Sequence, residues 1–407
     1  MTGIAAISSS VVTEPSAALT HGKRVTVQRI SVTDYRNYTH ASFRPNGENV
    51  ILTGANGVGK TNVLEAVSFL VPGRGLRRVR LDEISRNDTD DDASRPLRPW
   101  AVAVQIDGDG GAIDIGTGLD PDHQGVRERR VVRVDGQPEK NQSVLAEHIA
   151  VVWLTPQMDG LFIDGPGARR RFLDRLVYVS DGAHAGRVTA YEKAMRDRAR
   201  LLAEHGAGAD AGWLDALEGV MVEKGMSVAA ARRDMIGRLR VFIAGSEGPF
   251  PKAEISLSAG PDAWLDEMPA LAAEDKYREL LRNDRVRDAS DGRTATGPHR
   301  TDLLVRHVDK GRDAAICSTG EQKALLIGLV LAHARMQAAE QGRRPVILLD
   351  EVAAHLDQDR RQALFDLLCD LDTQVWMTGT DPALFAGMQG RARFFTVSDG
   401  AVHEQST

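Results

Sequence analysis

Short apolar runs alternate with longer stretches whose apolar residues recur at helical spacing, and this alternation predicts an α/β fold. Five of the apolar runs are read as strands, at residues 50–52, 151–154, 346–349, 374–378 and 394–397. Residues 25–32 alternate apolar and polar positions, which is typical of a strand with one buried face. A β-rich subdomain is expected beside the first apolar run, with further strands at 41–43, 101–106, 112–115 and 129–134.

The middle of the chain is helical in pattern, apart from a short strand expected at 253–257. We therefore expect a helical insert at 168–290 between two parts of one α/β lobe, at 24–167 and 291–400. Residues 1–23 are rich in Ser, Ala and Thr and lack a basic segment before an apolar core, which predicts a disordered tail rather than a signal peptide. Residues 401–407 are expected to be a short tail.

The stretch 54–61 reads Gly-Ala-Asn-Gly-Val-Gly-Lys-Thr, which matches the phosphate-binding pattern G-x-x-x-x-G-K-[ST]. It follows an apolar strand and leads into a helix, as a phosphate cradle requires, because glycines and a helix N-terminus present backbone N–H groups to phosphate oxygens. Lys60 is predicted to contact the β- and γ-phosphates of ATP as a catalytic residue, and Thr61 to ligate Mg²⁺. The alternative is a glycine-rich turn that matches by chance. The predicted ATP-binding residues are Gly54, Ala55, Asn56, Gly57, Val58, Gly59, Lys60, Thr61 and Asn62.

Two acids follow the apolar run at 346–349, which is the pattern of a Walker-B strand. Because the acids emerge at the carboxyl end of a buried strand, they are expected beside the phosphate loop. Asp350 is predicted to hold Mg²⁺ together with Thr61, and Glu351 to orient or deprotonate the attacking water. The alternative is a structural Asp at a strand end.

The segment Ser318, Thr319, Gly320, Glu321 and Gln322 precedes a long apolar helix expected at 324–336. It resembles the signature sequence of the ABC ATPase superfamily; the alternative is a plain helix N-cap with a capping box. The resemblance implies that this segment contacts the γ-phosphate held by a second subunit, so that two subunits sandwich two ATP molecules. It also implies that Asp357 belongs to the dimer-spanning D-loop.

Two further positions are open. Gln157 resembles the Q-loop glutamine that senses Mg²⁺ and water, and a surface glutamine after a proline is the equal alternative. The superfamily's switch histidine is absent after the run 374–378, where Thr380 stands as a possible γ-phosphate donor. This departure argues against fast hydrolysis.

The 407 residues carry a net charge of −6, with 42% hydrophobic and 27% charged residues, so any DNA contact must come from a local basic patch. The two cysteines give no disulfide framework and no metal pair, and no apolar stretch reaches the length of a membrane span. We therefore expect a cytoplasmic protein that contacts no membrane. The candidate DNA contacts, for each of which a solvated or structural ion pair is the alternative, are Arg74, Arg77, Arg78, Arg169, Arg170, Arg196 and Arg198.

Several motifs together resemble the RecF family of bacterial recombination mediators. They are 34–38 (Asp-Tyr-Arg-Asn-Tyr), the loop 54–61, the basic loop 73–78, 169–174 (Arg-Arg-Arg-Phe-Leu-Asp), 297–302 (Gly-Pro-His-Arg-Thr-Asp) and 318–323. Gln157 departs from this family, which more often has an acidic residue there.

The resemblance implies an α/β, ABC-type, Rad50/SMC-head-like P-loop ATPase domain with an inserted helical lobe, using ATP and Mg²⁺. It implies a homodimer that forms on ATP, a weak DNA-stimulated ATPase, and binding to double-stranded and gapped DNA in recombinational repair and replication. It also implies RecR and RecO as partners in loading RecA. Arg36 is a candidate contact to adenine or phosphate.

Other classes stay open at this point. One is another SMC- or Rad50-like ATPase, although the insert lacks long heptad arms. A nuclease built on an ABC head would need an acidic metal cluster, for which the sequence after Phe395 offers no room. A transporter-type ATPase subunit would lack the helical insert.

Overall fold

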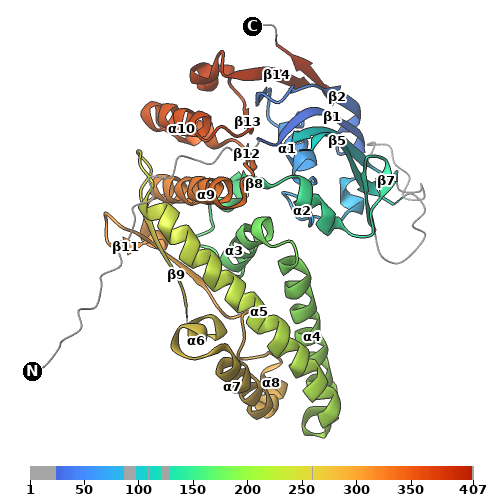
Figure 1. The fold of residues 1–407 in the computed structure, drawn as a ribbon, viewed down its shortest axis with the longest axis vertical. Coiled ribbons are helices and arrows are strands. Elements are labelled where there is room, and N and C mark those ends of the chain that lie inside the picture. The colour runs from blue at the N-terminus through green and yellow to red at the C-terminus, as the bar shows by residue number, and fades with distance from the viewer. Residues whose placement is uncertain (1–23, 87–97, 109, 121–128, 259, 406–407) are drawn as a thin grey trace, which may run out of the picture.

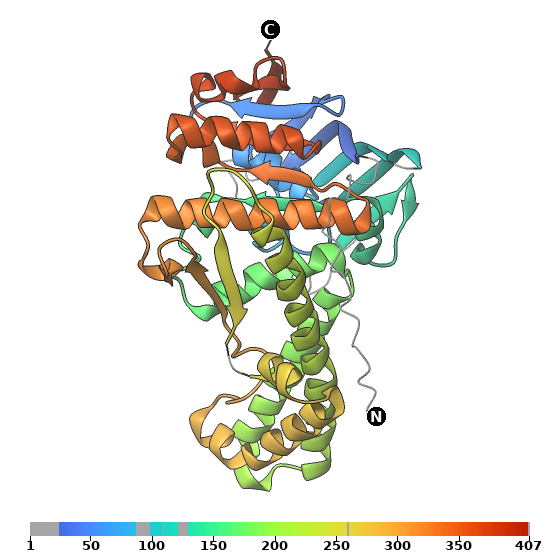
Figure 2. The same cartoon turned by 60° about the vertical axis from the view of Figure 1, so that its left-hand side comes forward.

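The computed structural model describes residues 24–86, 98–108, 110–120, 129–258 and 260–405. The chain forms an α/β head and a helical arm that extends away from it (Figures 1 and 2). The expected disordered tail at 1–23 lies outside the described residues. No helix among the described residues is long and apolar enough to cross a membrane.

The main sheet of the head has six strands in the order β15-β14-β3-β13-β12-β8. Five of them run parallel, and the edge strand β15 pairs antiparallel with β14. Their bounds are β3 Asn49–Thr53, β8 Val151–Leu154, β12 Val346–Leu349, β13 Val375–Gly379, β14 Ala392–Ser398 and β15 Ala401–Glu404. The expectation of a tail from residue 401 is therefore wrong for 401–404, because this segment pairs antiparallel with the edge of β14.

A second, antiparallel sheet has the order β2-β1-β4-β5-β6-β7. Its strands are β1 Thr26–Tyr35, β2 Tyr38–Phe43, β4 Ala101–Gly108, β5 Gly111–Leu119, β6 Arg130–Val134 and β7 Gln137–Pro138. β1 and β2 form a tight hairpin in which Tyr35 pairs with Tyr38, and both rings are fully buried. The motif 34–38 is thus a hairpin turn with two core tyrosines.

Helices fill the space around these sheets. In the head they are α1 Lys60–Ser68, α2 Leu145–His148, α9 Thr319–Gln341 and α10 Gln358–Asp370, with short 3-10 turns η1 Asp82–Ile84, η2 Gln142–Val144, η3 Pro156–Met158, η5 Ala314–Ile316, η6 Val352–His355 and η7 Pro382–Met388. Apolar residues lie all round α9, and nearly all of them from Ala324 to Ala338 are buried. Such a helix belongs in a core, and α9 lies between the main sheet and the start of the arm (Figure 1).

The arm consists of α3 Pro166–Ser180, α4 His184–His205, η4 Gly206–Gly208, α5 Ala211–Ala244, α6 Pro261–Glu267, α7 Ala270–Asn283 and α8 Arg285–Asp291. A three-stranded sheet joins it to the head through β9 Ala253–Leu257, β10 Leu303–His307 and β11 Arg312–Asp313. The outer part of the arm has an apolar cluster of its own around Tyr191, Met221 and Tyr277, separate from the continuous core of the head.

Candidate nucleotide site and basic residues

The glycine loop turns sharply between β3 and α1. Gly54, Gly57 and Gly59 have φ values of 148°, 82° and 114°, a region that L side chains rarely adopt. A Cβ on Gly54 would approach the Val397 carbonyl oxygen to 2.4 Å. The loop therefore needs glycine at these positions both for its backbone conformation and for its contact with β14.

The β1–β2 hairpin holds this loop from outside. Tyr38 Oη donates to the Gly59 carbonyl at 3.0 Å, and Asn37 Nδ2 donates to the Val58 carbonyl at 2.8 Å. Asn62 Nδ2 in turn donates to Asn37 Oδ1 at 2.7 Å. These contacts fix the loop's carbonyls and leave its N–H groups to a ligand. The sequence does not predict that Asn37 and Tyr38 support the glycine loop, although the motif 34–38 that contains them is one of those that resemble the RecF family.

Sheet order brings the acids to the loop. β13 lies between β3 and β12, and all three strands end at the same edge. Thr61 Oγ1 donates to Asp350 at 2.9 and 3.0 Å, so one hydroxyl and one carboxylate, both ligands that Mg²⁺ prefers, meet here. In the presence of nucleotide, Thr61 and Asp350 would hold the metal and a phosphate would complete its shell.

Thr378 is a residue of this site that sequence reasoning missed. Met377 pairs with Leu349, so the next residue on each strand, Thr378 and Asp350, come side by side. Thr378 Oγ1 donates to Asp350 Oδ1 at 2.7 Å and accepts from the Glu351 backbone N–H at 2.9 Å. One buried hydroxyl therefore positions both predicted acids. Thr380, the residue favoured from sequence, is exposed beyond the strand end.

The charges of the site lie close together and are only partly compensated. Lys60 is 4% exposed, and its Nζ donates to the carbonyls of Gly54 and Ala55 at 2.8 Å each. Burial lowers the pKa of Lys60, while the nearby Glu351 and Asp350 carboxylates act in the opposite direction. Burial raises the pKa of Asp350; hydrogen bonds from Thr378 and Thr61 oppose this, and the Glu351 charge adds to it.

The Glu351 side chain is free to act. Its backbone has φ 54°, in the left-handed region, directly after the end of β12. Its carboxylate makes no hydrogen bond or ion pair with any described residue, so it is available to a water molecule near the phosphates. Its role as the catalytic base stays a prediction.

Arg36 has partners within the protein. Its guanidinium grips the fully buried Glu65 of α1 with bonds of 2.8 and 2.7 Å and donates to the Glu83 carbonyl at 2.9 Å. Arg77 reaches the same carboxylate at 3.3 Å and Asn62 at 2.6 Å. Both arginines thus brace the helix that carries Lys60 and Thr61. Contact of Arg36 with ATP stays a prediction, and the DNA role of Arg77 competes with these bonds.

The signature segment forms the start of α9. Ser318 is the N-cap, and Glu321 completes a capping box with a 2.9 Å bond from the Ser318 N–H. Lys310 pairs with Glu321, and this ion pair is the main reason that the pKa of Glu321 falls to about 2. Gln322 is buried and donates to the Cys317 carbonyl at 3.0 Å. The capping box considered from sequence is therefore present.

The outer face of this segment is exposed and is not used for packing within the described part of the chain. Ser318, Thr319 and Gly320 are exposed, and a Cβ on Gly320 would meet nothing within 4 Å. A glycine in a helix costs about 0.5–1 kcal/mol relative to alanine, and intramolecular packing does not require it here. No hydrogen bond or ion pair among the described residues joins this segment to the glycine loop of the same chain.

Gln157 and Asp357 have defined positions. Gln157 is exposed in η3, directly after β8, at the same sheet edge as Asp350. Two residues later, Asp159 accepts from Lys323 of α9 at 3.1 Å, which links this turn to the signature helix. Asp357 caps α10 by accepting from the Arg360 N–H at 2.8 Å. Their Q-loop and D-loop roles stay predictions.

The arginines predicted to contact DNA have very different surroundings. Arg74 and Arg78 are exposed on the loop after α1, and Arg196 is exposed beside Glu192 at 3.7 Å. Arg169 instead forms a two-bond pair with Asp302 at 2.7 and 2.8 Å. Arg170 donates to the Thr301 carbonyl at 3.0 Å, which agrees with the structural alternative of packing the arm onto the chain that returns to the head.

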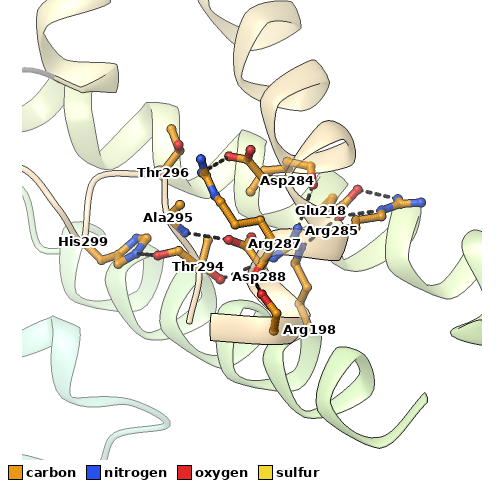
Figure 3. Close-up of polar contacts among 12 residues, drawn as sticks. Arg198, Glu218, Asp284, Arg285, Arg287, Asp288, Thr294, Ala295, Thr296 and His299 are labelled. Carbon is orange, nitrogen blue, oxygen red and sulfur yellow. Dashed lines mark hydrogen bonds and ion pairs between the residues drawn. The ribbon is translucent and has the colours of Figure 1, made fainter. Parts of the chain in front are cut away.

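The prediction that Arg198 contacts DNA is wrong, because its side chain is 0% exposed. It donates to Glu218 at 2.9 Å, to Asp288 at 2.7 Å and to the Leu281 carbonyl at 2.7 Å. Arg285 also donates to Glu218, so an ion network holds α4, α5 and α8 together (Figure 3).

The strand order, the glycine loop after β3 and the acids after β12, with a helical arm inserted between them, define an ABC-type ATPase head. The Smc head domain with an extended coiled coil from Pyrococcus furiosus shares this fold, with a TM-score of 0.52 at 14% identity over 94% of this chain and 96% of that one.

More specific matches cover nearly the whole chain. The family model described as RecF/RecN/SMC N terminal domain matches residues 26–403. The DNA replication and repair protein RecF of Agrobacterium fabrum is 49% identical over 93% of this chain and 98% of its own length, and that of Rhizobium meliloti is 45% identical over 93% and 99%. A solved structure of the recombination mediator protein RecF-ATPrS in the RecFOR pathway has a TM-score of 0.80 at 23% identity, covering 95% of this chain and all of that one. The chain belongs to the RecF family.

Proposed function

We propose that this protein is an ATP-dependent DNA-binding protein of replication and recombinational repair, in which ATP joins two copies of the chain. The observation that carries the proposal is a nucleotide site that is half complete. One side presents the glycine loop, Lys60, Thr61 and Asp350, while the exposed Ser318–Gly320 helix start makes no hydrogen bond or ion pair with that loop among the described residues of its own chain.

Each half contributes different chemistry. The loop N–H groups and Lys60 bind the phosphates, Thr61 and Asp350 hold Mg²⁺, and Glu351 orients water for hydrolysis. Ser318 and the N–H groups at the start of α9 supply an anion site to the γ-phosphate of the partner copy. Binding of ATP then stabilises the dimer, and slow hydrolysis releases it.

The DNA part of the proposal is supported by the family and by the exposed basic loop. RecF relatives carry names of DNA replication and repair, and a RecF structure is named as a recombination mediator in the RecFOR pathway. We propose binding to double-stranded and gapped DNA, with RecR and RecO as partners in loading RecA. Arg74 and Arg78 beside α1 and the outer arginines of the arm are the candidate phosphate contacts.

Sedimentation with ATP, Mg²⁺ and a short gapped duplex tests the proposal. Glu351→Gln is expected to accumulate as an ATP-bound dimer, because hydrolysis is lost while binding remains. Ser318→Arg is expected to bind ATP as a monomer, because the larger side chain blocks the approach of a second chain. An ATP-loaded Ser318→Arg protein that still sediments as a dimer would refute the split site.

The DNA arm of the same experiment distinguishes the classes left open by sequence. Binding to duplex that increases with ATP and weakens steeply with salt supports the proposal. Absence of such binding, with ATP-dependent dimerisation intact, favours a transporter-type ATPase subunit.

A further inference from the structure

The arm contains a cavity of about 540 Å³, whose lining residues all come after residue 166 in the sequence and do not include the glycine loop. Its walls come from α3, α4, one turn of α5 and the segment 292–300. Two acids, Asp174 and Glu192, line it together with six arginines and no lysine. The arginines are Arg170, Arg171, Arg196, Arg232, Arg293 and Arg300.

Two of the six arginines are neutralised within the protein. Arg232 binds Asp174 through two bonds of 2.8 Å, and both side chains are buried. Arg196 lies 3.7 Å from Glu192 at the surface. These pairs use both acids of the lining.

The other four arginines have no acidic partner among the described residues. Arg170 donates to the Thr301 carbonyl, and Arg300 donates to the Thr294 carbonyl at 3.2 and 2.9 Å. Arg171 and Arg293 make no hydrogen bond or ion pair with any described residue. Four positive charges therefore line one concave space without a directly bonded carboxylate among the described residues, and the more distant Asp302 and Asp174 partly offset the charge of Arg170.

Like charges that line one concave space repel each other, and the repulsion increases where water is excluded. Burial is the main cause that lowers the pKa of Arg170; the Arg232 and Arg171 charges add to this, and the Asp302 and Asp174 carboxylates oppose it. An anionic ligand would relieve this repulsion, and the fork of a guanidinium matches phosphate oxygens in a bidentate geometry.

The floor of the cavity is apolar. Val188, Met195, Val228 and Pro298 line it, and the Tyr191 ring forms part of the wall. The volume lies within the range of small-ligand pockets, about 300–1,000 Å³. An apolar floor under a basic rim suits a ligand that has a flat, weakly polar body and charged phosphates.

The rim is held in place from behind. Asp288 accepts from both Arg198 and the Ala295 N–H, at 2.7 and 3.0 Å, so the ion network of the arm fixes the segment 292–300 (Figure 3). His299 bonds to Thr294 O at 3.0 Å and to Tyr191 Oη at 2.6 Å. A site built on fixed elements loses little entropy when it binds, so this support favours a ligand.

We propose that this arm cavity is a second nucleotide-binding site, with phosphate on its arginine rim and the base on its apolar floor. The nucleotide has two possible sources, a free nucleotide or an unpaired 5′-phosphorylated nucleotide at a DNA gap. The second source rests on the proposed DNA function, whereas the first does not.

The test uses the full chain with Lys60→Ala, which removes the main phosphate contact of the glycine loop. Titration calorimetry with ATP and fluorescence anisotropy with a 5′-phosphorylated single-stranded oligonucleotide report the remaining binding. Adding Arg171→Ser and Arg300→Ser is expected to weaken it by about tenfold or more, since each charge-assisted contact contributes roughly that much. Both arginines are exposed, and Arg171→Lys with Arg300→Lys should restore part of the affinity.

Arg233→Ser with Arg306→Ser is the matched control. It removes the same net charge from exposed arginines that already pair with Asp266 and Glu254. A loss confined to the cavity variant supports the proposal, and the probe that binds tighter identifies the source. Equal losses in both variants, unchanged binding, no residual binding at all, or full displacement by polyglutamate would each overturn it. ATP-dependent dimerisation of the chain with an intact Lys60 tests the split site separately.

Discussion

The nucleotide site of the head and the outer arm both bury charged side chains, but they balance them in opposite ways. In the head, Lys60 and Asp350 have mostly neutral partners, namely backbone carbonyls and the hydroxyls of Thr61 and Thr378. In the outer arm, the buried Arg198 meets the carboxylates of Glu218 and Asp288 directly. Charge left uncompensated inside a fold is available to a ligand, whereas charge paired inside a fold serves structure.

This contrast also divides the arm itself. In the network around Arg198, the buried arginine is paired with the carboxylates of Glu218 and Asp288. At the rim of the arm cavity, four arginines have no carboxylate partner among the described residues. The ion network and the arginines of the cavity rim are connected through the segment 292–300, which hydrogen-bonds to Asp288 and carries two of the rim arginines. The paired set holds the unpaired set in position.

The most severe way to break the paired set is Arg198→Ala. It would leave Glu218 and Asp288 buried without their shared cation, at a cost of about 3–5 kcal/mol in the free energy of unfolding. Urea unfolding followed by circular dichroism measures this. Arg200→Ala removes an exposed arginine whose one ion-pair partner among the described residues is Asp197; it is the control and should cost at most about 1 kcal/mol. Equal effects of the two substitutions would mean that the buried network is not structural.

Thr378→Val tests whether the buried hydroxyl in the head positions the two acids. The valine keeps the shape but loses the bonds to Asp350 and to the Glu351 N–H, so both acids lose their common support. We expect ATP hydrolysis to fall by about 10- to 100-fold, as for other residues that orient metal ligands. Thr380→Val is the control in a steady-state ATPase assay. A larger loss at Thr380 would assign the supporting role to the residue indicated by the sequence.

Tyr38→Phe is the mildest test. It removes one bond from a neutral hydroxyl to the Gly59 carbonyl and leaves the buried ring in place. The expected loss is about 0.5–1.5 kcal/mol in ATP binding, or a few-fold in Kd, measured by titration calorimetry. Tyr178→Phe removes a hydroxyl in α3 and should leave Kd unchanged. If both variants bind ATP like the unsubstituted protein, the hairpin does not support the loop.

The parts of the site that are continuous in sequence were predictable. The glycine loop between a strand and a helix, the acids after an apolar run and the helix start at Ser318 each require only local spacing. Thr378 was not predictable, because it meets Asp350 only through the pairing of β13 with β12. For the same reason, no local pattern shows that Tyr38 reaches Gly59.

Two predictions are wrong although the sequence holds a local signal for each. The basic composition of this segment predicts a surface charge at Arg198, yet Arg198 lies at helical spacing on the buried face that carries Tyr191, Ala194 and Leu201. That spacing was a usable signal, outweighed by the expectation that arginine stays exposed. The strand at 401–404 also had a local signal, because Asp399-Gly400 is a two-residue hairpin turn with positive φ at both residues, and it pairs Ser398 with Ala401.

The pair between Arg169 and Asp302 has a consequence for the architecture as a whole. It joins two points 133 residues apart, one where the chain leaves the head and one where it returns. For the head, the outer part of the arm is then a loop whose base is fixed. The entropy of closing a loop grows only with the logarithm of its length, so lengthening the arm adds little to the cost of folding the head. The arm can therefore lengthen or shorten during evolution while the ATPase head keeps its fold.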